Sequence, residues 1–145
     1  MAGHQINITR RQFQESSKNH YLLYKNTQDD LSPRTRRLIL FYAVECGLKS
    51  LIMKDLGKDN YKDFKTYSEN NNLRIHTHDL KAMTREIGIE HNYPLKRIPL
   101  SKGNPVDSAR FNELWRYGAE VEDVNDEIET EKTLQKIAEW IEQRL

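Results

Sequence analysis

The stretch SPRTRRLILFYAVECGLKSLIMKDLG, residues 32–57, limits what this chain can fold into more than any other segment. Ser32 is a residue type that often caps a helix N-terminus, and Pro33 suits the first helical position. Gly57 stands where a residue in the left-handed conformation commonly ends a helix. The segment therefore predicts one long helix whose two ends are specified by its own sequence.

Apolar residues surround most of this predicted helix. They are Leu38, Ile39, Leu40, Phe41, Tyr42, Ala43, Val44, Cys46, Leu48, Leu51, Ile52, Met53 and Leu56. A helix that is apolar on nearly all sides is a central one, so we expect other helices to pack around it. Glu45 and Lys49 stand four residues apart within it, in the order that favours a helical ion pair. On an exposed surface such a pair contributes about 0.2–0.5 kcal/mol, and we interpret it as structural.

The composition favours a single all-α domain. The chain has 145 residues, of which 37% are hydrophobic and 31% charged, with four prolines and six glycines. A chain of this length can bury a core without cross-links. The longest apolar run, residues 38–44, is far shorter than the roughly 20 residues of a membrane span, and the single Cys46 excludes an internal disulfide. We expect one cytoplasmic domain over residues 1–145, with residues 1–8 loosely ordered and no membrane partner.

Two further helices are indicated on either side of the central one. Thr9 and Gln12 form a capping box and predict a helix that runs to about Thr27. Its apolar side comprises Phe13, Tyr21, Leu22 and Tyr24. Thr77 is a natural N-cap, and Gly88 suits the end of a second, shorter helix.

The C-terminal part predicts a long connection and two more helices. Residues 88–106 contain three prolines and are expected to pack across the bundle without regular structure. Asn104 and Pro105 resemble an N-cap and first-turn pair, which predicts a helix that buries Phe111, Leu114 and Trp115. The last helix is expected to follow the acidic segment and the residues TEKT, 130–133. Its apolar face would comprise Leu134, Ile137, Ala138, Ile141 and Leu145.

The charge is distributed unevenly. Residues 1–110 contain 19 Lys and Arg against 12 Asp and Glu, whereas residues 111–145 contain 4 against 10. A basic region can contact phosphates while an acidic one meets a partner, although solvated helix faces explain the same pattern. Arg34, Arg36 and Arg37 fall near the positive end of the central helix, where cations are unfavourable without an anion nearby. They are candidate RNA contacts, with solvated arginines as the alternative.

Aromatic and basic residues alternate between residues 58 and 67. Tyr61, Phe64 and Tyr67 are interleaved with Lys58, Lys62 and Lys65. Such a pattern can stack bases and contact the backbone of a single-stranded nucleic acid. It also fits a short helix whose aromatic residues anchor it to the core, and both interpretations stay open.

Three segments together resemble the HEPN superfamily (higher eukaryotes and prokaryotes nucleotide-binding). They are YAVECGLKSLI in the central helix, HTHDLKAM from His76 to Met83, and ELWRYG, which contains Arg116 and Tyr117. The resemblance implies an antiparallel four-helix-type bundle with additional short helices. It also implies RNA cleavage or RNA or nucleotide binding in toxin–antitoxin or anti-phage defence systems, as a homodimer or a subunit of a larger complex. In that family the His78–Asp79 segment has mainly a structural role.

Catalytic members of the family are metal-independent RNases in which a histidine follows an arginine by four to six residues. Arg85 and His91 match this spacing, but they straddle the predicted helix end, and the late segment with Arg116 has no histidine after it. Histidine moves protons near neutral pH, and arginine stabilises charge on a phosphate. The pair is therefore a candidate catalytic site. Arg74, His76 and His78, gathered in one loop, are accessory candidates, and so are Arg116 and Tyr117.

No other chemistry has a supporting motif. His76 and His78 lack a cysteine or a second histidine pair that would complete a metal site, so no metal is expected. There is no P-loop and no Gly-x-Gly-x-x-Gly pattern, so no cofactor is expected. The leading hypothesis is an RNA- or nucleotide-associated binding and assembly module without robust catalysis. The alternatives are a metal-independent endoribonuclease that uses Arg85 and His91, and a structural interaction protein with an accidental resemblance to the family.

Overall fold

The central helix has the boundaries that its sequence predicts. The computed structural model describes residues 6–27 and 29–145, and α2 (Pro33–Leu56) is the longest helix among them. The Ser32 side chain accepts a hydrogen bond from the Thr35 N–H, and Gly57 ends the helix with φ of 68°. The predicted cap at each end is confirmed.

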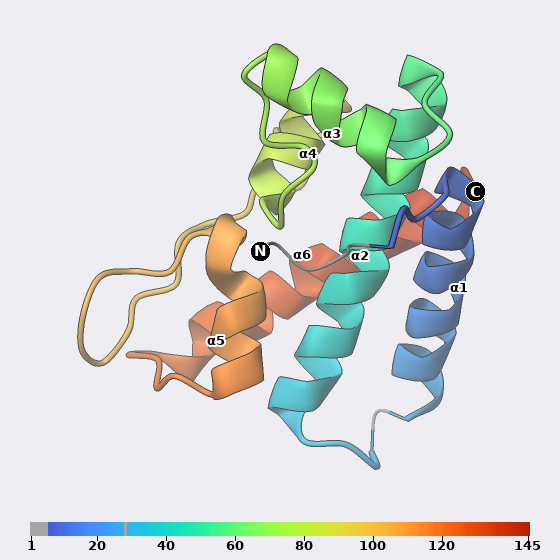
Figure 1. The fold of residues 1–145 in the computed structure, drawn as a ribbon. Helices are drawn as coiled ribbons and strands as arrows, with labels where there is room; N and C mark the ends of the chain where they lie inside the picture. The colour runs from blue at the N-terminus through green and yellow to red at the C-terminus, as the bar shows by residue number, and fades with distance from the viewer. Residues whose placement is uncertain (1–5, 28) are drawn as a thin grey trace.

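Helices make up the regular structure of the described residues, so the all-α prediction is confirmed. Besides α2 they are α1 (Arg10–Asn26), α3 (Tyr61–Asn70), α4 (Leu80–Glu86), α5 (Phe111–Tyr117) and α6 (Val124–Glu142), with a 3₁₀ turn, η1 (Ser108–Arg110), before α5. In Figure 1, α1 runs antiparallel to α2, α6 crosses behind α2, and α3 and α4 lie at its C-terminal end. Within the described ranges, no helix is both long and apolar enough to cross a membrane.

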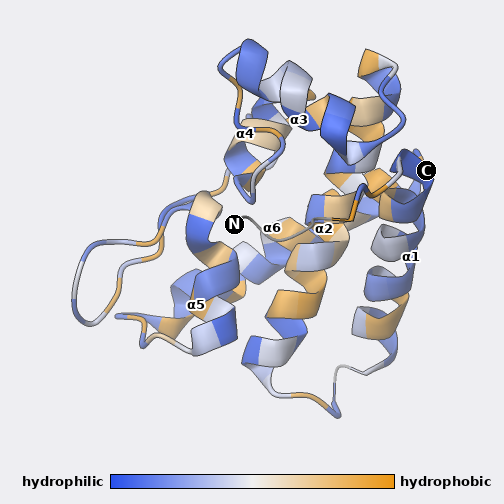
Figure 2. Cartoon of the chain, in the orientation of Figure 1, coloured by the Kyte–Doolittle hydropathy of each residue, from blue (hydrophilic) through white to orange (hydrophobic). Residues whose placement is uncertain are grey.

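The core lies where α1, α5 and α6 meet α2. Figure 2 shows hydrophobic residues along α2 and on the faces of the neighbouring helices that pack against it. The largest side chains that are almost completely buried include Tyr24, Phe41, Phe64, Phe111 and Trp115. Phe64 anchors α3 to the core, as one of the two interpretations of the aromatic pattern predicts for it. Leu22, predicted on the buried side of α1, is exposed because the helix turns Tyr21 and Tyr24 toward α2 and α6 instead.

Gly47 sets how closely the helices approach α2. A Cβ atom at this position would lie 2.6 Å from Ile141 Cγ2 and 2.6 Å from Ser17 Oγ, and Ser17 is held by its hydrogen bond to the Ala43 carbonyl. We expect Gly47→Ala to lower the free energy of unfolding by about 1–3 kcal/mol through overpacking. Urea unfolding followed by circular dichroism measures this change.

Gly57→Asn is a matched control for the Gly47 variant. A Cβ atom at Gly57 would have no neighbour within 4 Å, and asparagine tolerates a positive φ. The loss there should be smaller than at Gly47, because asparagine is the residue that sometimes replaces glycine in the left-handed conformation at a helix C-terminus. Equal losses in the two variants would contradict close packing at Gly47.

Three helices begin at other residues than predicted, because a nearby aspartate provides the cap. The Asp79 side chain, not that of Thr77, accepts the Ala82 N–H at the start of α4. Asp107, not Asn104, caps the turn before α5. The last helix starts at Val124, earlier than predicted, after the cap Asp123. The acidic segment thereby enters the first turn of α6, where its charge favours the helix dipole.

Residues 7–8 make contacts that were not predicted, whereas the connection over residues 88–106 packs against the core as predicted. The Asn7 side chain accepts the Lys62 N–H, and the Ile8 carbonyl accepts the Tyr61 N–H, so residues 7–8 cap the start of α3 rather than lying loose. Residues 1–5 lie outside the described residues. In the connection over residues 88–106, Ile98 is buried and forms an isolated bridge with Val106. This bridge is incompatible with a helix that starts at residue 105.

Candidate functional site

A buried ion pair lies in the C-terminal half of α2. Glu45 Oε2 accepts a hydrogen bond from Lys49 Nζ at 2.8 Å, and the two residues are only 6% and 3% exposed. The spacing predicted the pair, but the neighbouring helices remove it from water. Burying two charges is costly, and removing one partner of such a pair is strongly destabilising. Its energetic role is therefore much larger than that of an exposed pair.

His78 completes a three-residue network with this pair. Its Nδ1 lies 2.9 Å from Glu45 Oε1, so each carboxylate oxygen has one partner. Burial raises the pKa of Glu45, but the hydrogen bond from His78 and the charge of Lys49 outweigh burial, and the net pKa lies below its ordinary value. Glu45 is therefore ionised at neutral pH and fixes the Nδ1–H tautomer of His78.

A second histidine is oriented by a serine. His76 Nδ1 lies 2.6 Å from Ser68 Oγ, and the Ser68 hydroxyl donates its only proton to the Leu73 carbonyl at 3.0 Å. Ser68 Oγ must therefore accept from His76 Nδ1–H, which leaves the lone pair on Nε2 of the neutral ring. Burial lowers the pKa of His76 below its ordinary value, so the ring is neutral at pH 7.

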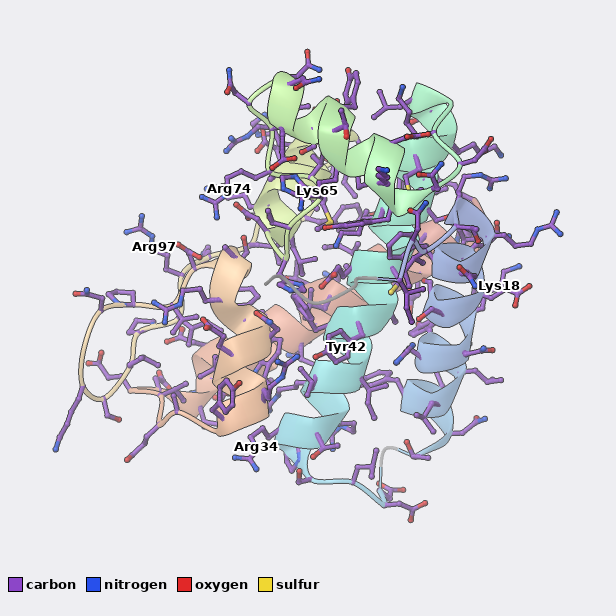
Figure 3. All side chains as sticks on the ribbon, viewed as in Figure 1. Lys18, Arg34, Tyr42, Lys65, Arg74 and Arg97 are labelled. Atoms are coloured by element: carbon purple, nitrogen blue, oxygen red, sulfur yellow. The ribbon has the colours of Figure 1, made fainter. Side chains whose placement is uncertain are left out.

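The two histidines and Lys49 line one pocket of about 820 Å³. The pocket is bounded by Ile6, Ile8, Phe13, Lys49, Tyr61, Lys65, Glu69, His76, Thr77 and His78. Lys49 is held by its hydrogen bond to Glu45, while Tyr61 and Lys65 come from α3. Figure 3 shows Lys65 on the side of the molecule formed by α3. Residues from α1, α2, α3 and the loop before α4 thus meet in one cavity.

The predicted pair Arg85 and His91 lies in a different cleft, of about 730 Å³. Arg85 Nε donates to Glu90 Oε2 at 3.2 Å, and His91 Nε2 lies 3.9 Å from Glu90 Oε1. The His91 side chain is 95% exposed. Glu90 contacts both groups, so each already faces a carboxylate. The cleft also contains three more basic residues, Lys81, Lys96 and Arg97.

The arginines at the start of α2 face acidic residues of α6. Arg37 Nε donates to Glu131 Oε1 at 2.9 Å, and Arg37 Nη1 lies 3.5 Å from Glu127 Oε2. Arg36 Nη2 lies 3.6 Å from Glu131 Oε2. The anions near this helix end are therefore carboxylates of the same chain. Arg34 lies against Gly118, where it would contact an added Cβ.

The remaining candidates are on the surface. The Arg116 guanidinium donates to the Tyr42 hydroxyl, and Tyr117 is largely exposed. Arg74 Nε lies 3.4 Å from Asp79 Oδ2, outside the pocket that His76 and His78 line. Of the accessory candidates, the structure therefore brings only the two histidines together with the Glu45–Lys49 pair.

Sequence reasoning did not identify Ser68 and Glu69 as parts of this site. Neither belongs to a motif, and both are placed by the packing of α3. Lys65 and Tyr61 had a signal, because they belong to the alternating aromatic and basic pattern. Glu45 and Lys49 also had a signal, because they lie within a helix that is apolar on nearly all sides, and charged residues in such a helix are buried only when they are paired.

Comparisons with other proteins do not extend these observations. No family model, curated protein or solved structure matches the chain. Within residues 6–27 and 29–145, no group of three or more His, Cys, Asp and Glu side chains is placed to hold a metal ion.

Proposed function

We propose that this chain is a diverged HEPN-like module that binds RNA or a nucleotide in a toxin–antitoxin or anti-phage defence system. The three sequence segments that resemble the superfamily support this, as does the helical fold. The finer architecture, an antiparallel four-helix-type bundle with short additional helices, belongs to the same proposal. So does assembly as a homodimer or as a subunit of a larger complex.

The observation that carries the proposal is the position of Lys49 beneath the pocket. Within the described part of the chain, Lys49 Nζ donates one hydrogen bond, to Glu45 Oε2. An ammonium group has three N–H donors, so two are left for an anionic ligand. Lys65 adds a second positive charge at the pocket wall, and Phe13 and Tyr61 add aromatic rings. Cations beside aromatic rings suit a phosphate joined to a base.

Lys65→Ala tests RNA binding at this pocket. We expect weaker binding of a fluorescently labelled single-stranded RNA and a salt dependence whose slope falls by about 1, because one phosphate contact is lost. Fluorescence anisotropy at several salt concentrations measures both. The control is Lys18→Ala on α1, away from the pocket (Figure 3), which should leave the slope unchanged. Salt-independent or absent binding by the folded wild type would contradict the proposal.

A second candidate function is a metal-independent endoribonuclease that uses Arg85 and His91. The observation in its favour is that both side chains line the same cleft, beside Lys96 and Arg97. The late helix with Arg116 and Tyr117 contains no histidine, which favours the binding module over this enzyme. His91→Ala separates the two and is included in the experiment below.

A further inference from the structure

We infer that the pocket above Lys49 is itself a metal-independent RNA-cleaving site, in which His76 accepts the proton of a ribose 2′-hydroxyl and His78 protonates the leaving 5′-oxygen. The inference rests on the proposed function, because the substrate must first bind in this pocket. It assigns catalysis to residues other than Arg85 and His91. Its basis is that His76, His78 and the buried Lys49 line one pocket of about 820 Å³. Ser68 orients the first histidine and Glu45 the second.

His76 is suited to act as the base. Ser68 Oγ occupies its Nδ1–H, so the unprotonated nitrogen is Nε2, which is the nitrogen that can accept a proton from a substrate. The charged groups around the ring are Lys49, Lys65, Glu69 and Arg74. Burial and the three cations keep the ring neutral, whereas Glu69 opposes them. A neutral imidazole with an available lone pair is the form that a general base requires.

His78 is suited to act as the acid. Its Nδ1–H is held by Glu45 Oε1 at 2.9 Å, so Nε2 is the nitrogen that exchanges a proton with a substrate. The side chain is about half exposed, so a substrate can reach Nε2 from the pocket. A histidine oriented by a carboxylate is a recurrent arrangement in proton transfer.

Lys49 is suited to stabilise the phosphate during the reaction. Negative charge accumulates on the non-bridging phosphate oxygens in the transition state, and a fixed cation at a site shielded from water stabilises it most. The Lys49 ammonium is held by Glu45 and by its contact with the Phe13 ring, whose centroid lies 5.9 Å from Nζ. It therefore needs little reorganisation when the charge develops.

The reaction balances without a metal ion or a redox partner. The 2′-oxygen attacks phosphorus as its proton moves to His76 Nε2. The bond between phosphorus and the 5′-oxygen breaks, and that oxygen receives the proton of His78 Nε2. The products are a 2′,3′-cyclic phosphate and a free 5′-hydroxyl, and proton exchange with water restores both rings.

The test is cleavage of a single-stranded RNA by the full chain in EDTA, with product ends identified by mass spectrometry. His76→Asn and His78→Asn keep an amide N–H for Ser68 and Glu45 and should therefore fold. We expect each to cut about 10²–10⁴-fold more slowly, the usual contribution of a general acid or base. The wild-type rate should rise and then fall with pH, and His76→Asn should lose the rise at acidic pH. The control, Lys18→Ala, lies away from the pocket and should cut like the wild type, and His91→Ala is measured beside it as the test of the other cleft.

The same samples are tested for binding to an uncleavable 2′-deoxy analogue. Cyclic phosphate ends that disappear in both asparagine variants support the inference. If the folded wild type binds the analogue but does not cut RNA, the inference is wrong and the binding function stands. If His91→Ala abolishes cleavage while the asparagine variants retain it, the site lies at Arg85 and His91 instead. If the wild type neither binds nor cuts, both proposals are wrong.

Discussion

Lys49→Met is expected to lower the free energy of unfolding by about 3–5 kcal/mol, because it leaves a buried carboxylate without its cation. Glu45 is only 6% exposed, so its carboxylate gains little water when it loses the hydrogen bond that Lys49 Nζ donates to Oε2. His78 still contacts Oε1. Methionine has nearly the length and shape of the lysine chain, so packing changes little and the effect is electrostatic.

Urea unfolding measures the loss, and two further variants identify its cause. Glu45→Gln/Lys49→Met replaces the carboxylate with a neutral amide and should recover most of the stability, since a buried ion pair exchanged for neutral groups is often close to neutral in energy. Lys132→Met removes an exposed lysine paired with Glu129 at 3.3 Å and should cost less than about 1 kcal/mol. Similar losses for Lys49→Met and Lys132→Met would refute a buried pair.

The free energy of unfolding measured at acidic pH provides a second test of the Glu45–Lys49 pair. The folded-state pKa of Glu45 lies below its ordinary value of 4.5, so its ionisation stabilises the fold above that value, and this contribution is lost as the pH falls through the folded-state pKa. Removing Lys49 removes a group that keeps the pKa low. Lys49→Met should therefore begin to unfold at a higher pH than the wild type.

The sequence predicts elements whose caps are unambiguous. Ser32, Pro33 and Gly57 mark α2 from both sides, and Thr9 with Gln12 forms the capping box of α1. These are local interactions within three or four residues, so the chain specifies them before any tertiary contact forms. Their positions follow from the sequence because Pro33 marks the first helical position after Ser32, and Gln12 completes the capping box with Thr9.

Other helix starts depend on a choice between neighbouring polar residues. Thr77 and Asp79 can both cap a helix, and in the fold Thr77 donates to the Arg74 carbonyl while Asp79 caps α4. Asn104 and Asp107 present the same choice. Val106 bridges Ile98, so the chain is still extended there and only Asp107 can cap. Local sequence does not resolve such choices, because tertiary contacts decide them.

The candidate site was predictable only in parts. The spacing of Glu45 and Lys49 predicts their ion pair, but not the contact of Glu45 with His78, which lies 33 residues away in sequence. The orientation of His76 depends on Ser68, a residue with no distinguishing pattern. Residues that converge from separate helices form a site through packing, and a one-dimensional pattern does not contain that information.

The interface of α2 with α6 contains a second buried network. Glu131 accepts from Arg37 Nε at 2.9 Å and from the Tyr24 hydroxyl, and Gln135 Nε2 donates to that hydroxyl at 2.7 Å. Burial, and then the hydrogen bond to Glu131, raise the pKa of Tyr24 well above its ordinary value. The network joins α1 and α2 to α6, which lies far from both in sequence. It also explains why arginines are tolerated at the positive end of α2.

Glu131→Ala is expected to lower the free energy of unfolding by about 3–5 kcal/mol, because Arg37 is buried and loses its closest anion. Glu127, 3.5 Å from Arg37 Nη1, retains part of the interaction, which places the loss toward the lower end of that range. Thermal and urea unfolding measure it. Absorbance titration should show a lower pKa for Tyr24, because the carboxylate that opposes its ionisation is gone.

Glu129→Ala is the matched control on the same helix, because Glu129 is exposed and pairs only at the surface with Lys132. Its loss should stay below about 1 kcal/mol. Arg37→Met/Glu131→Met removes both charges together and should be more stable than Glu131→Ala alone, since no unpaired buried cation remains. If the double variant is instead less stable than the single one, the cost of Glu131→Ala comes from lost packing of α6 against α2 and not from the unpaired, buried charge of Arg37.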